Sequence, residues 1–94
     1  MAKFTVRVEI LDGTISDHDR LEKIMLEQGF DRSIRSDSGR IYKLPPGEFN
    51  YAGEIERQQL REKVQACAGQ LGKSYSLLIT ESKGRSWFNL NKLN

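Results

Sequence analysis

The stretch ESKGRSWFNLNK, residues 81–92, places the only tryptophan of the chain close to two cationic side chains. An indole ring such as that of Trp87 can stack on a nucleic-acid base, and the nearby Lys83 and Arg85 can neutralise phosphates. This combination is typical of single-stranded nucleic-acid binding. Trp87, Lys83 and Arg85 are therefore candidate RNA-binding residues.

The same stretch has a structural interpretation. Ser86, Phe88 and Leu90 alternate with Trp87 and Asn89, as in a short extra strand. Such a strand would bury Phe88 and Leu90 against the protein or a second subunit and leave Trp87 on its other face. The alternation favours this strand, and one face of it could still present Trp87 to RNA.

A second group of candidate RNA-binding residues surrounds the turn of a predicted hairpin. Arg32, Arg35 and Arg40 flank this turn and could converge on one patch that clamps phosphates without a metal. Arginines on an exposed hairpin also serve solubility, and we weigh the two interpretations equally. Tyr42 could stack on a base from an open sheet face, although a half-buried strand tyrosine is the commoner role.

Two residues near the first predicted turn could carry hydrolytic chemistry. Asp12 follows the first strand, where a carboxylate can hold a divalent ion or orient a water for phosphodiester cleavage. Asp followed by Gly is also a common turn pair, which makes a structural role for Asp12 the stronger expectation. His18 could serve as a general base, a common role of the imidazole side chain, whereas an exposed histidine is more often simply solvated.

Metal and cofactor chemistry has few candidate ligands in this chain. The chain has one cysteine, Cys67, and one histidine, so it cannot build a Cys/His metal cluster or an intrachain disulfide. Cys67 falls on the apolar stripe of a predicted helix, where a core role is expected. We expect no metal site and no cofactor, and a divalent ion at Asp12 stays open.

The composition indicates one small globular domain over residues 1–94, with residues 82–94 as a tail or edge strand. The chain has 94 residues and a net charge of +2, which is too small to indicate a dedicated nucleic-acid binder. No apolar run is long enough to span a membrane, and no signal peptide is recognisable. We therefore expect a cytoplasmic protein without a membrane partner.

Apolar spacing predicts the secondary structure. The first elements expected are a strand over 4–10 and a helix that begins with a capping box at Ser16 and Asp19 and ends at Gly29. A hairpin follows, whose second strand bends at Pro45 and Pro46 and continues to 53. A helix over 54–68 and a buried strand over 75–80 complete the order. This order predicts an α+β, ferredoxin-like βαββαβ fold. Its four-stranded antiparallel sheet would carry both helices on one face.

Four stretches of the sequence, FTVRVEILDG, the GF after the first helix, IYKLPPGEFNYAG and ITESKGRSWFNL, resemble the GhoS-like family of endoribonuclease antitoxins of type V toxin-antitoxin systems. The resemblance covers nearly the whole chain and lies mainly in element order and spacing. It implies a ferredoxin-like fold similar to that of small CRISPR-associated nucleases, a sheet that can dimerise and an RNA substrate. Asp12 matches the place of an acidic residue in those nucleases.

These observations lead to one hypothesis and one alternative. The hypothesis is a bacterial RNA-interacting protein that acts as an antitoxin by cleaving toxin mRNA. The candidate cations and aromatics would bind the RNA, and Asp12 or His18 would assist hydrolysis. The alternative is a noncatalytic module that forms a homodimer or binds a protein through the open sheet face and a C-terminal strand.

Overall fold

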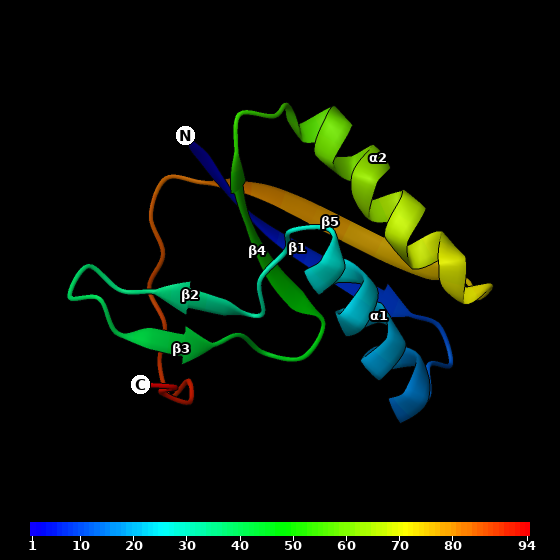
Figure 1. Ribbon diagram of the computed structural model, residues 1–94, viewed down its shortest axis with the longest axis horizontal. Helices are drawn as coiled ribbons and strands as arrows, with labels where there is room; N and C mark the ends of the chain where they lie inside the picture. Colours follow the sequence, from blue (N-terminus) through cyan, green and yellow to red (C-terminus); the bar gives the residue numbers. More distant parts are fainter.

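The computed structural model describes all residues, 1–94, as an α+β domain (Figure 1). The elements, in order, are β1 (Ala2–Ile10), α1 (Ile15–Glu27), β2 (Ser33–Arg35), β3 (Ile41–Lys43), β4 (Glu48–Gly53), α2 (Arg57–Ala68), a 3-10 turn (Gly69–Leu71) and β5 (Tyr75–Ser82). Neither helix is long and apolar enough to cross a membrane.

The sheet is built around β1, whose apolar residues alternate with polar ones. β1 pairs antiparallel with β4 on one side and with β5 on the other, giving the order β4-β1-β5. The even-numbered side chains from Phe4 to Ile10 are buried, while Thr5 and Arg7 point to the opposite face. The period-two pattern in the sequence therefore produces one covered and one open face of the sheet, as predicted.

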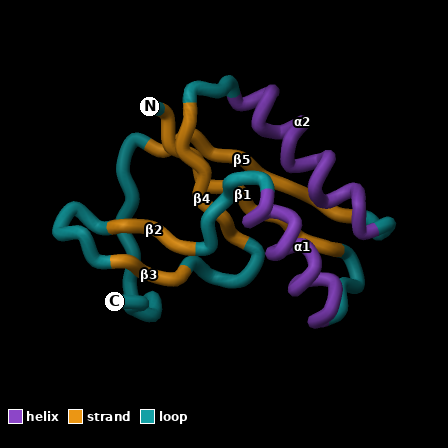
Figure 2. The backbone as a smooth tube through the Cα atoms, in the orientation of Figure 1, coloured by secondary structure: helices purple, strands orange, loops and turns teal.

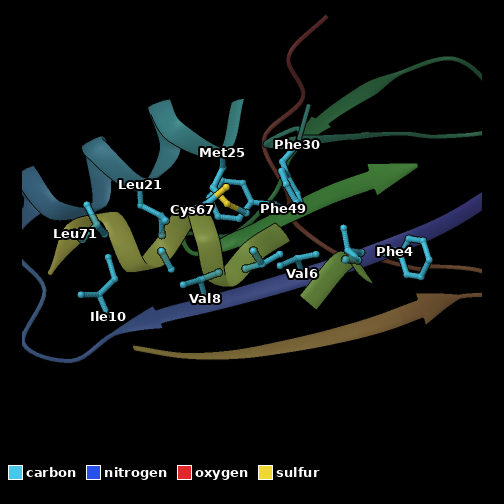
Figure 3. Packing of buried hydrophobic residues seen from close by; sticks show 13 residues of the cluster. Phe4, Val6, Val8, Ile10, Leu21, Met25, Phe30, Phe49, Cys67 and Leu71 are labelled. Carbon is cyan, nitrogen blue, oxygen red and sulfur yellow. The ribbon is translucent and has the colours of Figure 1, made fainter. Parts of the chain in front are cut away.

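Both helices pack on the covered face of the sheet and enclose a core of 13 buried residues (Figure 3). In α2 the buried side chains are Leu60, Val64, Cys67 and Ala68, which confirms the predicted apolar stripe. Burial in this core raises the pKa of the Cys67 thiol, despite an opposing effect of the positive charge of Lys63. Cys67 therefore has the structural role that its position indicated.

The start of α1 differs from the prediction by two residues. The capping box is formed by Thr14 and Asp17, each of whose side chains accepts a hydrogen bond from the backbone N–H of the other. The predicted box at Ser16 and Asp19 is wrong, because the helix begins two residues earlier and the Thr14 hydroxyl accepts from the N–H of Asp17. Gly29, at φ 90°, follows the C-cap Gln28, which agrees with the predicted stop.

The sheet only partly matches the predicted four-stranded arrangement. Three strands form the main sheet, and β2 and β3 form a separate two-stranded hairpin beside it (Figure 2). At the position beside β4 where a fourth strand would lie, only Asp31 pairs with Asn50, through two backbone hydrogen bonds of 2.8 and 2.7 Å. The order β4-β1-β5 roughly fits the predicted ferredoxin-like fold, whereas the prediction of one four-stranded sheet is wrong.

The segment between β3 and β4 explains why the predicted long bent strand is divided. Pro45 and Pro46 have no N–H to donate, so the ladder cannot continue through them. Gly47 then adopts φ 82° and accepts a 2.9 Å hydrogen bond from the N–H of Val8. A Cβ at Gly47 would lie 2.9 Å from the carbonyl oxygen of Val8, so the close approach of this loop to β1 requires glycine.

The tail after β5 runs to the hairpin and pairs with β3. The N–H of Lys43 donates to the carbonyl oxygen of Asn91 at 2.9 Å, and the N–H of Leu93 donates to that of Ile41 at 2.8 Å. The C-terminus consequently lies beside β3 (Figure 1). The predicted C-terminal strand is therefore reduced to a short bridge, and it pairs with the protein's own hairpin.

Candidate nucleic-acid interface

An open cleft of about 540 Å³ lies between the hairpin and one end of the main sheet. Its walls come from the start of β1, the end of β5, the end of β2 and the first residues of the tail. The charged and aromatic residues that line it are Lys3, Arg35, Asp37, Glu81, Lys83, Arg85 and Trp87. We call this hollow the cationic cleft, because its cations outnumber its carboxylates.

Arg85 holds the tail against the open face of the sheet. Its Nη2 donates a 2.8 Å hydrogen bond to the carbonyl oxygen of Phe4, and its Nε donates a 3.1 Å bond to Oγ1 of Thr5. Both acceptors are uncharged, and Arg85 forms no salt bridge with any carboxylate. Partial burial lowers the pKa of the guanidinium. Arg85 is therefore a partly desolvated positive charge with no counter-ion in the protein.

The other cations of the cleft are freely accessible. Lys3, Arg35 and Lys83 are exposed, and only Arg35 forms a hydrogen bond, from its Nη1 to the carbonyl oxygen of Gly39 at 3.3 Å. Lys3 lies on β1, which sequence reasoning did not single out. The period-two pattern could have placed Lys3 on the open face of the sheet, because every second side chain of β1 faces the same way.

Trp87 and Tyr42 form an aromatic pair between the tail and β3. Their ring centroids are 5.3 Å apart and their planes are inclined by 56°, a favourable tilted geometry. Both side chains are half-buried, and Trp87 lines the cationic cleft. The predicted orientation of the tail is wrong, since Phe88 is 92% exposed and Trp87 makes the packing contact. The strand alternation does not apply because residues 86–90 form no strand.

A second hollow of about 490 Å³ adjoins the cationic cleft on the other side of the tail. Ile34 and Leu44 of the hairpin segment are buried there, yet they lie outside the main core. Trp87 and Leu90 of the tail line the same hollow. The hairpin and tail thus share a small apolar cluster that positions the aromatic pair.

The three hairpin arginines do not converge. Arg32 points away from the cationic cleft, and its Nη1 donates to the carbonyl oxygens of Leu44, Pro45 and Glu48 at 3.2, 2.9 and 2.7 Å. Its guanidinium also lies 5.5 Å from the Phe49 ring centroid. Arg32 is therefore a clamp for the loop before β4, and the prediction of a single arginine patch is wrong.

Arg40 lies after the turn of the hairpin and is exposed. Its backbone N–H donates to Oγ of Ser36, and its side chain makes no hydrogen bond or salt bridge. Arg40 is not among the residues that line the cationic cleft, whereas Arg35 is. Of the predicted RNA-binding residues, the cleft thus gathers Arg35, Lys83, Arg85 and Trp87, with Tyr42 packed behind Trp87.

The two candidate catalytic residues lie at the other end of the sheet. Asp12 follows the C-terminal end of β1 and has φ 54°, as expected for a tight turn. His18, in the first turns of α1, is exposed and lines a small hollow of about 210 Å³ with Glu22 and Arg32, which form a salt bridge of 3.7 Å. The β1–α1 loop and the hairpin lie at opposite ends of the domain (Figure 1). Arg32 is therefore the one predicted RNA-binding residue that lies beside a predicted catalytic residue, and the residues of the cationic cleft lie apart from Asp12 and His18.

The strongest ionic interaction near Asp12 involves a neighbouring residue that sequence reasoning did not select. Asp17 is buried and forms a salt bridge with Nζ of Lys73, which also donates to the backbone carbonyl of Asp12 at 3.4 Å. The hydrogen bond from Lys73, with those from Thr14, lowers the pKa of Asp17 from 3.8 to about 2. The spacing of Thr14 and Asp17 was the signal that could have identified this residue.

No group of three or more His, Cys, Asp or Glu side chains is placed to hold a metal ion. A divalent ion at Asp12 would therefore depend on ligands from a substrate or another molecule. No protein-family model matches the chain, and no curated protein matches it. The resemblance to the GhoS-like family stays a prediction based on the quoted sequence stretches.

Proposed function

We propose that this protein binds single-stranded RNA in the cationic cleft. The observation that carries the proposal is Arg85, a partly buried cation that is bonded only to uncharged acceptors. A phosphate in the cleft would supply the missing negative charge, and charge-assisted hydrogen bonds of this kind are strong. Lys3, Arg35 and Lys83 extend the positive surface around it.

The aromatic pair supports RNA over a free anion as the ligand. Trp87 lies in the wall of the cleft with one side packed against Tyr42, so its ring is held in place before any ligand binds. A preorganised aromatic ring next to cations is the arrangement on which unpaired bases stack. Double-stranded nucleic acid does not offer a free base face, and we propose a single-stranded segment.

Cleavage of a toxin mRNA by an antitoxin is the finer part of the proposal and rests on the family resemblance. RNA bound in the cleft would have to run along the open face of the sheet to reach Asp12 and His18. β1 has nine residues and therefore a length of about 30 Å. An RNA segment of several nucleotides could span this distance, with exposed Arg7 midway along the face.

The binding test uses a fluorescein-labelled single-stranded RNA and measures fluorescence polarisation as salt is varied. Lys83→Ala and Arg35→Ala should weaken binding, and each should reduce the slope of log K against log salt by about 0.7, the value for one lost phosphate contact on a single strand. Lys23→Ala is the matched control, since Lys23 is an exposed lysine on α1. An equal loss in the Lys23 variant, or no binding by the wild type, would refute the proposal.

The cleavage test incubates the same RNA with the wild type, with and without magnesium, and compares Asp12→Asn and His18→Ala variants. If the finer proposal holds, discrete fragments appear with the wild type and are lost in a variant that still binds RNA. Retained binding without fragments would leave an RNA-binding protein without nuclease activity.

A further inference from the structure

One edge of the main sheet is closed and the other is open. The outer edge of β4 is closed by Asp31, which forms two backbone hydrogen bonds with Asn50. β5, at the opposite edge, pairs only with β1, and no strand lies on its other side (Figure 2). An eight-residue strand thus leaves a row of backbone donors and acceptors unpaired.

The pairing of β1 shows which backbone groups of β5 are free. The N–H of Val8 points to the β4 side, where it bonds to Gly47, so the odd-numbered residues of β1 point to β5. The N–H of Leu11, which bonds to the carbonyl oxygen of Ser74, agrees with this direction. Because Arg7 is opposite Leu78, the even-numbered residues of β5 bond to β1 and the odd-numbered ones point outward.

The sequence of β5 protects this edge only near its C-terminal end. Proteins usually blunt an exposed edge with a proline, a bulge or an inward-pointing charge. Glu81, opposite buried Phe4, is such a charge, whereas residues 75–80, YSLLIT, contain no charged residue, no proline and no glycine. Leu78, at the centre of the strand, is 64% exposed on the open face of the sheet. This edge has the features of a strand that pairs with another chain.

We propose that two copies of this chain associate through antiparallel pairing of their β5 edges, with Leu78 on the two-fold axis. Outward-pointing residues must oppose each other in such a pair. The register centred on Leu78 satisfies this condition, because Leu77 then lies opposite Ile79 of the second copy. It also places the two exposed Leu78 side chains in contact and brings no like charges opposite each other within β5. The result is a continuous six-stranded sheet.

Two cations beside the edge set the strength and salt dependence of the dimer. Arg57 and Arg61 of α2 line a hollow of about 390 Å³ with Leu77, Leu78 and Ile79, and neither arginine forms a salt bridge. In the dimer, the arginines of both copies lie on the helix-covered side of the sheet and repel each other. An edge contact of this small size is weak and transient, and it should become tighter as salt screens this repulsion.

Disulfide trapping tests the register directly. Residues on the two-fold axis face each other as a non-hydrogen-bonded pair with Cα atoms about 4.5 Å apart, close enough for a disulfide. Leu78→Cys should therefore form a covalent dimer under mild oxidation. Ser76→Cys and Thr80→Cys are the controls, because each lies about 14 Å from its own copy in this register. Native Cys67 is buried in the core and is present in all three proteins.

Sedimentation velocity at increasing protein concentration tests the association itself. The wild type should dimerise more strongly at higher salt, and Leu78→Lys should be monomeric with an unchanged melting temperature. Leu26→Lys, at an exposed leucine on α1, should leave the dimer intact. A monomeric wild type at every concentration, or trapping at position 76 or 80 as efficient as at 78, would overturn the proposal. Dissociation by salt together with binding of an acidic peptide would show instead that the edge accepts a foreign strand.

Discussion

Arg85 is bonded through its guanidinium to the backbone carbonyl of Phe4, although the two residues are 81 positions apart in the chain. Phe4 belongs to the central strand, and Arg85 belongs to the tail that forms one wall of the cationic cleft. The bond therefore fixes a wall of the proposed binding site to the most constrained strand of the fold. Arg85 has a structural role in addition to the RNA contact proposed for it.

The first prediction concerns this double role. Arg85→Ala should lower the free energy of unfolding by about 1–3 kcal/mol, since it removes two hydrogen bonds from a charged donor. It should also weaken RNA binding. Urea denaturation followed by Trp87 fluorescence measures the first effect. Lys83→Ala is the control, because exposed Lys83 makes no hydrogen bond, and it should affect RNA binding alone.

The second prediction concerns the pair formed by Trp87 and Tyr42. Tyr42→Ala should expose the indole, shift its fluorescence emission to longer wavelength and weaken RNA binding through loss of the fixed ring position. A double-mutant cycle with Trp87→Ala should give a coupling energy of about 0.5–1.5 kcal/mol. Tyr75→Ala, which changes a tyrosine outside the pair, should leave the emission wavelength unchanged. Zero coupling would show that the two rings act independently.

The third prediction concerns acid stability and Asp17. The pKa of this carboxyl is lowered on folding from 3.8 to about 2, chiefly by the hydrogen bond from Lys73. Its charged form therefore stabilises the protein fully at pH values well above 3.8, and this contribution is lost as the pH falls towards 2. The urea concentration at half-unfolding should differ between the wild type and Asp17→Asn most strongly near neutral pH. This difference should shrink as the pH falls towards 2.

Asp19→Asn provides the matched control for Asp17, because Asp19 is an exposed aspartate on the same helix and forms no salt bridge. Its urea midpoints should follow those of the wild type at every pH. Lys73→Met should reproduce most of the effect of Asp17→Asn. A gap that stays constant from neutral pH down to about 2 would contradict the assignment.

The fourth prediction separates two effects at glycines with positive φ. Gly47→Ala should destabilise the protein more than Gly72→Ala, because a Cβ at Gly47 would meet the carbonyl oxygen of Val8 at 2.9 Å while Gly72 has open space around it. The two glycines have similar φ values of 82° and 70°, so both variants carry the conformational cost of about 1 kcal/mol. The difference between their melting temperatures measures the close approach to β1.

The elements of the main layer could be predicted from the sequence because local patterns determine them. Alternation in β1 and the apolar stripe of α2 each report burial on one face, and both predictions are confirmed. The division of the sheet could not be predicted in the same way. Pro45 and Pro46 interrupt the ladder, but the position of the loop at 44–48 also depends on Arg32, whose three bonds to it join segments that are 12 to 16 residues apart.

The candidate site was predicted less completely than the fold. Residue type identified Arg35, Lys83, Arg85 and Trp87, which do gather in the cleft. Residue type alone could not show that Arg32 binds the backbone carbonyls of the loop at 44–48, or that Asp12 and His18 lie near the far end of β1. Those facts depend on the direction of each side chain and on the length of the central strand, neither of which a spacing pattern reports.

The separate apolar cluster of the hairpin and tail has a consequence for local unfolding. Ile34 and Leu44 are buried outside the main core, and the tail is joined to β3 by backbone bonds between residues about 50 positions apart. A unit with its own small core and such distant contacts can open while the main sheet stays folded. Amide hydrogens of Lys43 and Leu93 should therefore exchange with solvent sooner than that of Val6, and the cleft should be the first part of the molecule to come apart.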